Sequence, residues 1–317
     1  MSLAHNHHHH AHGALTRRAA IASVSMALFL LALKIFAAAE TGSVALLGSL
    51  ADTAFDVLAS LLTLFSVRYA AMPADDDHRF GHGKAEALSA LLQVILVTVS
   101  AILIAWRAIV RLGAQEKTAH PEYGIGVSII AIVATLGLLA YQRYVVRKTG
   151  SVAIQADHVH YQSDLLLNIG VIIAILLDTL LNVRGADPVF GIIIAFWLLW
   201  GAYRAAGMAL DQLLDREWPQ EKRQRFIEVA LRHPELRGIH DMRTRSSGVH
   251  DFCQFHVWVD PNMTVEAAHL IMDEVEQALM DEFPGVEVLI HPDPEGHKDE
   301  MGYLPSETIE HHEHPHD

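Results

Sequence analysis

Long apolar runs, separated by short polar segments, fill the first two thirds of the chain. A transmembrane helix needs roughly 20 apolar residues to cross the hydrocarbon core of a bilayer. No clear small-residue cleavage site follows the first run, so this run is predicted to stay as a helix and not to be removed as a signal peptide. The pattern therefore predicts an all-α membrane domain with six spans, at about residues 18–39, 43–70, 86–112, 123–146, 157–182 and 188–210.

The last third of the chain has shorter patterns. Residues 221–233 and 265–283 repeat their apolar positions with a helical period, whereas residues 238–245, 251–260 and 286–291 have the character of strands. The order helix, strand, strand, helix, strand predicts a small α+β domain whose helices lie on one side of a sheet.

Charge separates the same two regions. Residues 1–214 contain 14 basic and 14 acidic residues, and residues 215–317 contain 9 and 23, so the whole net charge of −14 lies in the last third. A neutral membrane domain is thus predicted to precede an acidic, soluble domain. Nucleic acid is excluded as a partner because it needs a basic surface. The single cysteine, Cys253, excludes an intramolecular disulfide and a Cys-based metal site.

Basic residues in the short loops predict the orientation, because they accumulate on the cytoplasmic side of a membrane. One side of the predicted bundle has Arg17, Arg18, Arg68, Arg79, Lys84, Arg143, Arg147, Lys148 and Arg204. The other side has Lys117 and Arg184, with Arg107 and Arg111 near a span end. Both termini and the acidic domain are therefore expected in the cytoplasm.

Two carboxylates interrupt the second apolar run. Asp52 and Asp56 lie four residues apart and share a helix face, although a carboxylate costs about 2.5–3.5 kcal/mol at the centre of a span. His160 and Asp164 have the same spacing at the start of the fifth run. Three carboxylates and one imidazole make a tetrahedral ligand set for a divalent ion such as Zn²⁺, and the ion's charge compensates for burying the carboxylates.

Each pair also has an explanation without a metal. Asp52 and Asp56 could line a water-filled cavity or pair with Lys34. Asp164 could cap a helix, with His160 in the loop before it. The first pair lies deep in its span and the second at the cytoplasmic edge, so a shared site requires an aqueous cavity open to the cytoplasm.

Other potential ligands lie outside the spans. The loop PADDDHRFGHGKAE contains Asp75, His78 and His82, whose spacing suits either a metal site or an ordinary solvated loop. His256 and His291 are predicted on polar strand faces, where a cluster could assemble. The set scattered through the soluble domain is His240, His256, His269, His291 and Asp293.

His-rich segments stand at both ends of the chain, AHNHHHHAHG and HHEHPHD. They are predicted to be disordered and able to hold metal loosely; the first is either a native feature or an expression tag. The predicted organisation is an N-terminal tail (1–14), a six-helix membrane domain (15–212), a cytoplasmic domain (213–295) and an acidic C-terminal tail (296–317).

Motifs occur in order over most of the chain, from about residue 15 to residue 295: SLADTAFDVLAS, PADDDHRFGHGKAEAL, ADHVHYQSDLLLN, LLDREWP, GIHDMRTRSSG, FCQFHVWVD and LIHPDP. Together they resemble the cation diffusion facilitator family, close to its bacterial ferrous-iron and zinc efflux pumps. Only the two tails fall outside the resemblance.

The resemblance implies a homodimeric transporter in the bacterial inner membrane, not an enzyme, with a metallochaperone-like (ferredoxin-like) cytoplasmic domain. It implies export of a divalent cation in exchange for protons by alternating access. Zn²⁺ is expected first, as transported substrate and regulatory ligand, and Cd²⁺ or Fe²⁺ next. In related subgroups, replacement of the transport-site histidine accompanies a shift toward Mn²⁺ or iron.

The residue types that the family uses recur here. The resemblance implies a transport site of Asp52, Asp56, His160 and Asp164, and a loop site of Asp75, His78 and His82. It implies a binuclear cytoplasmic site at the dimer interface, formed by His240, His256, His291 and Asp293 with a contribution from His269. It also implies a charge pair, Lys84 and Asp215, that interlocks the two domains.

Two other functional classes fit parts of the pattern. An intramembrane aspartyl protease also uses two membrane aspartates, but on different helices, and the chain has no GxGD stretch. A membrane metal sensor would not need ligands within the spans. Since metal ligands must be deprotonated, and histidine ordinarily has the pKa nearest to physiological pH, His160 is predicted to couple metal movement to protons.

Overall fold

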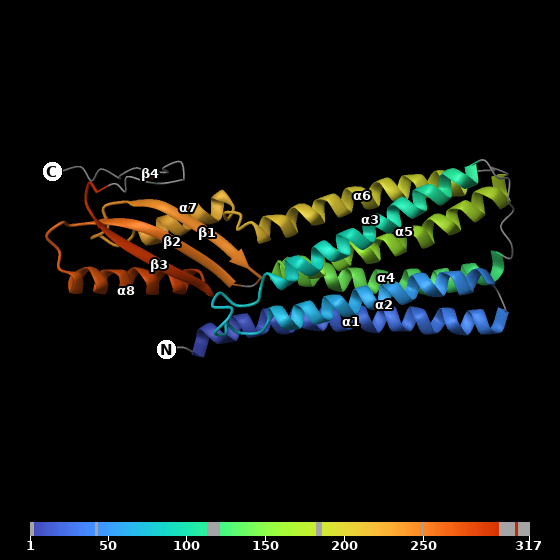
Figure 1. Ribbon diagram of the computed structural model, residues 1–317, viewed down its shortest axis with the longest axis horizontal. Helices are drawn as coiled ribbons and strands as arrows, with labels where there is room; N and C mark the ends of the chain where they lie inside the picture. The colour runs from blue at the N-terminus through green and yellow to red at the C-terminus, as the bar shows by residue number, and fades with distance from the viewer. Residues whose placement is uncertain are drawn as a thin grey trace. The chain divides into compact units, whose positions relative to one another are not determined.

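The computed structural model describes residues 3–41, 44–112, 121–181, 186–248, 250–297 and 308–309 of the 317. The chain divides into two compact units. His12–Leu213 forms a helical membrane unit, and Leu214–Asp317, grouped with Met1–Ala11, forms a C-terminal unit built on a sheet (Figure 1).

Six long helices make up the described part of the membrane unit and run alongside one another (Figure 1). Their bounds are α1 (Leu3–Thr41), α2 (Val44–Ala70), α3 (Ala85–Leu112), α4 (Pro121–Thr149), α5 (Val152–Leu181) and α6 (Ala186–Leu213). Within the described ranges, all of them except α5 contain a window long and apolar enough to cross a membrane. Helix α5 begins with the polar stretch QADHVHYQSD and continues into an apolar run. The chain is therefore a multi-pass membrane protein, as the six apolar runs predicted.

Small and β-branched residues bring the helices together. Ala20 of α1 packs with Val67 of α2, Val145 of α4 and Ile154 of α5. Ala101 belongs to a separate cluster between α3 and α6. Small side chains let helix backbones approach closely where lipid supplies no hydrophobic driving force. Polar side chains of α1, α2, α4 and α5 are thereby held at short range inside the unit.

The C-terminal unit contains α7 (Gln220–Ala230), β1 (Ile239–Ser247), β2 (His250–Val259), α8 (Val265–Glu282), β3 (Val286–Pro294) and β4 (Thr308–Ile309). In the described residues the sheet has four strands in the order β3-β2-β1-β4. Strand β1 is antiparallel to both β2 and β4, whereas β2 and β3 are parallel. The predicted α+β domain is confirmed.

One face of this sheet carries the hydrophobic core. Phe255 and Val257 of β2 pack with Phe226 of α7 and Leu279 of α8, and all four are almost completely buried. His256, between the two β2 residues, faces the other way because side chains alternate along a strand. The second face of the sheet thus carries His256, together with the buried Trp258 two residues along the same strand.

Two features differ from the sequence-based expectations. Helix α1 begins at Leu3, so the structure describes a helix where a disordered tail was expected, and its membrane-spanning window begins at Gly13. Strand β4 was not predicted, because its two residues lie in a segment without apolar alternation.

Candidate functional site

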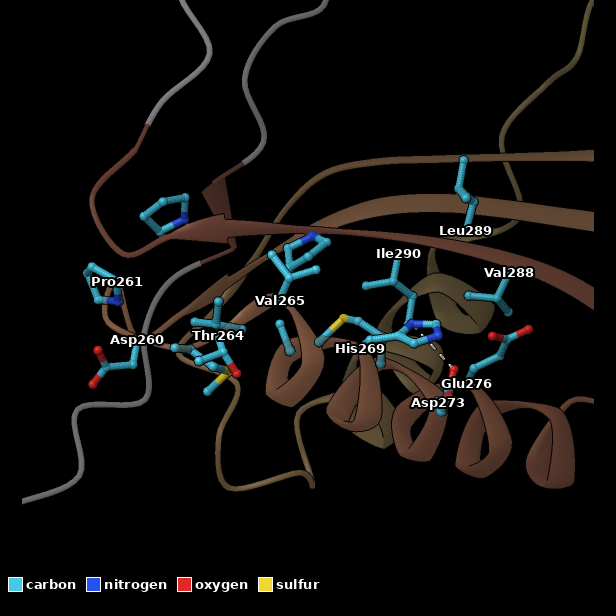
Figure 2. A pocket seen from close by; sticks show the side chains of 16 residues that line it. Asp260, Pro261, Thr264, Val265, His269, Asp273, Glu276, Val288, Leu289 and Ile290 are labelled. Atoms are coloured by element: carbon cyan, nitrogen blue, oxygen red, sulfur yellow. Dashed lines mark ion pairs between the residues drawn. The ribbon is translucent and has the colours of Figure 1, made fainter.

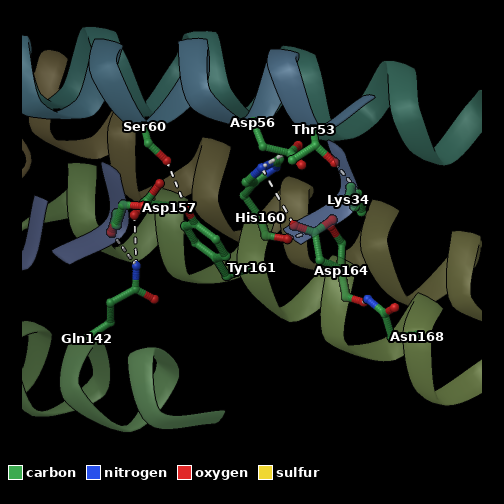
Figure 3. Close-up of polar contacts among 12 residues, drawn as sticks. Lys34, Thr53, Asp56, Ser60, Gln142, Asp157, His160, Tyr161, Asp164 and Asn168 are labelled. Atoms are coloured by element: carbon green, nitrogen blue, oxygen red, sulfur yellow. Dashed lines mark hydrogen bonds and ion pairs between the residues drawn. The ribbon is translucent and has the colours of Figure 1, made fainter. Parts of the chain in front are cut away.

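Two helices of the membrane unit bring the described transport-site residues together. His160 Nε2 of α5 lies 3.2 Å from Asp56 Oδ1 of α2 and 4.0 Å from Asp164 Oδ2, one turn further along α5. Figure 3 shows the three side chains pointing toward one another. Zinc bonds of about 2.0–2.1 Å in a tetrahedron place ligand atoms about 3.3 Å apart. These three side chains therefore fit around one small cation.

The fourth expected ligand, Asp52, is on α2 one turn before Asp56, but its side chain lies outside the described residues. Lys34 of α1, considered as a partner for the aspartates, donates to Thr53 Oγ1 at 2.5 Å (Figure 3). The lysine is thus close to the site and bound to a neutral hydroxyl.

Sequence reasoning missed a further carboxylate near this site, Asp157. Its residue has no exposed surface, and its Oδ2 accepts a 2.8 Å hydrogen bond from Gln142 of α4. It lies one turn before His160 and Tyr161 on α5. A signal was available in the sequence, since a carboxylate three residues before a candidate ligand shares a helix face with it.

The loop between α2 and α3 brings its three predicted residues together. Asp75 Oδ1 lies 3.3 Å from His78 Nδ1, and Asp75 Oδ2 lies 3.3 Å from His82 Nε2. The backbone N–H of His78 donates to Asp75 Oδ1 at 2.6 Å and holds the pKa of that carboxyl below its usual value. One carboxylate thus presents an oxygen to each imidazole, and the spacings again suit a tetrahedral cation.

Strand register builds a third group on the polar face of the sheet. His240 of β1 pairs with His256 of β2, and His256 pairs with His291 of β3, so three imidazoles form a row across neighbouring strands. Their ring centroids lie 5.2 and 4.7 Å apart, close to the strand spacing of about 4.8 Å. The row follows directly from the order β3-β2-β1.

Asp293, two residues beyond His291, completes this group. Its Oδ2 lies 3.2 Å from His240 Nε2 and 2.8 Å from His256 Nδ1, while its Oδ1 lies 3.3 Å from His291 Nε2. Burial, with the neighbouring His256, lowers the pKa of His240 and favours the neutral imidazole that binds metals. One carboxylate oxygen thus faces two imidazoles and the other oxygen faces the third. This arrangement would allow the carboxylate to bridge two ions.

His269 is not part of this group within the described chain. It is exposed on α8, where its Nδ1 lies 3.8 Å from Asp273 Oδ1. It lines a pocket of about 510 Å³ between α8 and the edge strand β3 (Figure 2). Because α8 packs on the apolar face of the sheet, its contribution to the cluster stays a prediction.

The expected interlock of Lys84 with Asp215 also stays a prediction, because these residues belong to different units. Within the membrane unit, Lys84 Nζ donates to the carbonyl of Leu213 at 3.4 Å. Within the C-terminal unit, Asp215 Oδ2 lies 4.0 Å from Arg245 Nη1.

Two protein-family models match consecutive parts of the chain. The model of the cation efflux transmembrane domain matches residues 20–214, and that of the cation efflux protein cytoplasmic domain matches residues 218–295. Cation-efflux pump FieF of Cronobacter sakazakii is 43% identical over 283 residues, and that of Salmonella arizonae is 44% identical over 283 residues. Each alignment covers 89% of this chain and 94% of the relative.

Among solved structures, the zinc form of the putative zinc transporter CzrB is 36% identical, with a TM-score of 0.25, and matches 27% of this chain and 98% of that one. The two family models together match most of the chain, with one in each unit. Because the family consists of transporters, the chain is not an intramembrane protease. The chain therefore belongs to the cation diffusion facilitator family, whose members are cation efflux transporters and not enzymes.

Proposed function

We propose that the chain exports a divalent cation from the cytoplasm in exchange for protons, with Zn²⁺ as the principal substrate and Cd²⁺ or Fe²⁺ as further ones. The convergence of Asp56, His160 and Asp164 inside the membrane unit, with ligand atoms within 4.8 Å of one another, carries this proposal. Asp52, one turn before Asp56, supplies the fourth ligand.

The ligand types support zinc. One imidazole with carboxylates is a borderline donor set that suits Zn²⁺, whereas sites made only of oxygen favour harder ions such as Mn²⁺. The cation also compensates for the cost of carboxylates within a span.

Protons and metal compete for the same side chains. Loading from the cytoplasm displaces protons from the ligands, the helices then rock so that the site faces outward, and external protons displace the ion. His160 is the principal coupling residue, because its Nε2 lies beside both Asp56 and Asp164.

The other two groups act on the cytoplasmic side. The His240, His256, His291 and Asp293 cluster binds Zn²⁺ as a sensor and stabilises a homodimer, in which His269 joins the cluster across the interface. The loop site of Asp75, His78 and His82 is an accessory cation site. We place the protein in the bacterial inner membrane with both termini in the cytoplasm.

Purified protein in liposomes loaded with a zinc-sensitive dye tests transport directly. With an acidic lumen, the wild type should accumulate Zn²⁺ as protons leave, and Asp56→Ala should accumulate none. His160→Ala should lose the acceleration by the pH gradient. Full pH-driven flux in His160→Ala would show that the coupling assignment is wrong. Absence of flux in the wild type would overturn transport and favour a membrane metal sensor.

A further inference from the structure

Five polar side chains form a buried network beside the transport site. They come from α1, α2, α4 and α5, and none of them has exposed surface: Ser23, Ser60, Gln142, Asp157 and Tyr161. Figure 3 shows Tyr161 and Asp157 on the same side of α5 as His160 and Asp164. None of these five residues belongs to the described ligand groups.

Tyr161 connects α5 to two other helices. Its hydroxyl donates to the carbonyl of Ser23 on α1 at 2.7 Å and lies 3.0 Å from the hydroxyl of Ser60 on α2. Tyr161 directly follows His160, and Ser60 is one turn after Asp56. The Ser60–Tyr161 contact therefore joins the same two helices as the Asp56–His160 contact, one turn further along α2 and at the next residue of α5.

Asp157 connects α5 to α4 and, through Gln142, to α1. The amide of Gln142 donates to Asp157 Oδ2 at 2.8 Å and to Ser23 Oγ at 3.0 Å. Among the described side chains Asp157 takes part in no ion pair, and its carboxylate accepts a hydrogen bond from the neutral amide of Gln142. Ser23 accepts two hydrogen bonds of the network. Its hydroxyl accepts from Gln142 and its backbone carbonyl accepts from Tyr161.

We propose that Tyr161 and Asp157 are positioning residues that hold α5 in the register at which His160 meets Asp56. A helix advances about 1.5 Å and turns about 100° per residue. A slip of α5 by one residue against α2 would thus move His160 out of reach of Asp56. The network anchors α5 to three neighbouring helices within one turn of His160. This inference rests on the proposed metal binding at that site.

A matched pair of serines on α2 tests the proposal. Ser60→Ala removes the contact with Tyr161, whereas Ser66→Ala removes a 2.8 Å bond from Ser66 Oγ to the carbonyl of Ala85 on α3, away from α5. Both serines are buried, and each variant loses one interhelical hydrogen bond. Tyr161→Phe removes a single oxygen from the network.

Zinc affinity is measured by calorimetry on the full-length, detergent-solubilised chain carrying His82→Ala and Asp293→Ala, which remove the other two groups. Adding Asp56→Ala to this chain defines the heat from the remaining histidines. Tyr161→Phe and Ser60→Ala should raise the zinc Kd about fivefold, the size of effect expected for one buried hydrogen bond. Ser66→Ala should leave the Kd unchanged while lowering the thermal unfolding temperature as much as Ser60→Ala.

Asp157→Asn keeps an acceptor for Gln142 and should bind zinc more tightly than Asp157→Ala. An unchanged zinc Kd in Tyr161→Phe would overturn the positioning role. So would a zinc Kd in Ser66→Ala that rises as much as the Kd in Ser60→Ala. These outcomes differ from failure of the proposed transport, which appears as absent flux in the unmodified protein. Should Asp157→Ala fail to fold, the serine pair and Tyr161→Phe still decide the question.

Discussion

His160 Nε2 lies 3.2 Å from Asp56 Oδ1, so one of the contacts between α5 and α2 is itself a contact between two candidate metal ligands. Neither helix holds the described set alone, because Asp56 comes from α2 and His160 and Asp164 from α5. Any movement between the two helices therefore changes the shape of the site, which is what a transporter with alternating access requires.

Replacing His160 with aspartate should change the choice of ion. The variant His160→Asp has only oxygen ligands, and such sites favour Mn²⁺ over Zn²⁺. The ratio of Zn²⁺ to Mn²⁺ flux in proteoliposomes should fall on the order of tenfold or more. Asp56→Ala is the control, since it should stop the flux of both ions. An unaltered flux ratio in His160→Asp would contradict the role of the imidazole.

Removing Asp293 should empty the cytoplasmic cluster. Its oxygens lie within 3.3 Å of His240, His256 and His291, so Asp293→Ala removes the one candidate ligand that lies beside all three imidazoles of the row. Zinc stoichiometry by equilibrium dialysis should fall, while zinc flux through the membrane unit persists. Glu287→Ala is a matched control, because Glu287 is an exposed carboxylate on the same strand. An equal number of zinc ions bound per chain in the two variants would contradict metal binding by the cluster.

Cys253 should resist alkylation in the folded protein. Burial in the core beside β1 and β3 raises the pKa of its thiol, so the reactive thiolate is scarcer than in an unfolded chain, where the pKa is about 8.5. Maleimide labelling at pH 8.5 should be slow until urea exposes the residue. The raised pKa of this thiol leaves the folding free energy unchanged at pH values below the unfolded-state pKa. It destabilises the fold as the pH rises above that value. Rapid labelling of the native protein would show that β2 opens locally.

Phe255 should be a principal contributor to the stability of the C-terminal unit. Its side chain is 1% exposed and packs edge-on against Phe226 of α7, with ring centroids 5.9 Å apart. Phe255→Ala should lower the free energy of unfolding by about 3–5 kcal/mol. The control Leu289→Ala, at a position 62% exposed, should change it by less than about 0.5 kcal/mol. Urea unfolding followed by tryptophan fluorescence measures both values.

Local spacing predicted some of these groups well. Asp75, His78 and His82 are near neighbours in the sequence, so one short loop is enough to bring them together. Each half of the proposed transport site was also predicted, because residues four apart share a helix face. Their meeting across two helices was inferred from ligand chemistry, since no sequence period relates Asp56 to His160.

Other relationships depend on packing between distant segments. The row of His240, His256 and His291 requires a particular strand order and register, which local patterns do not specify. The role of Asp157 depends on Gln142 of α4, a contact between helices that no local spacing predicts. His269 was grouped with the cluster by residue type, but α8 places it beside Asp273 within the single chain.

The register of the sheet has a practical consequence. His240, His256, His291 and Asp293 share a face only while β1, β2 and β3 are paired as observed, and a slip of β3 by one residue would send His291 and Asp293 into the apolar core. A mispaired domain therefore lacks the cluster. A divalent cation that needs all of these ligands would therefore bind only to a correctly paired sheet, so cation binding would distinguish correctly folded molecules from mispaired ones.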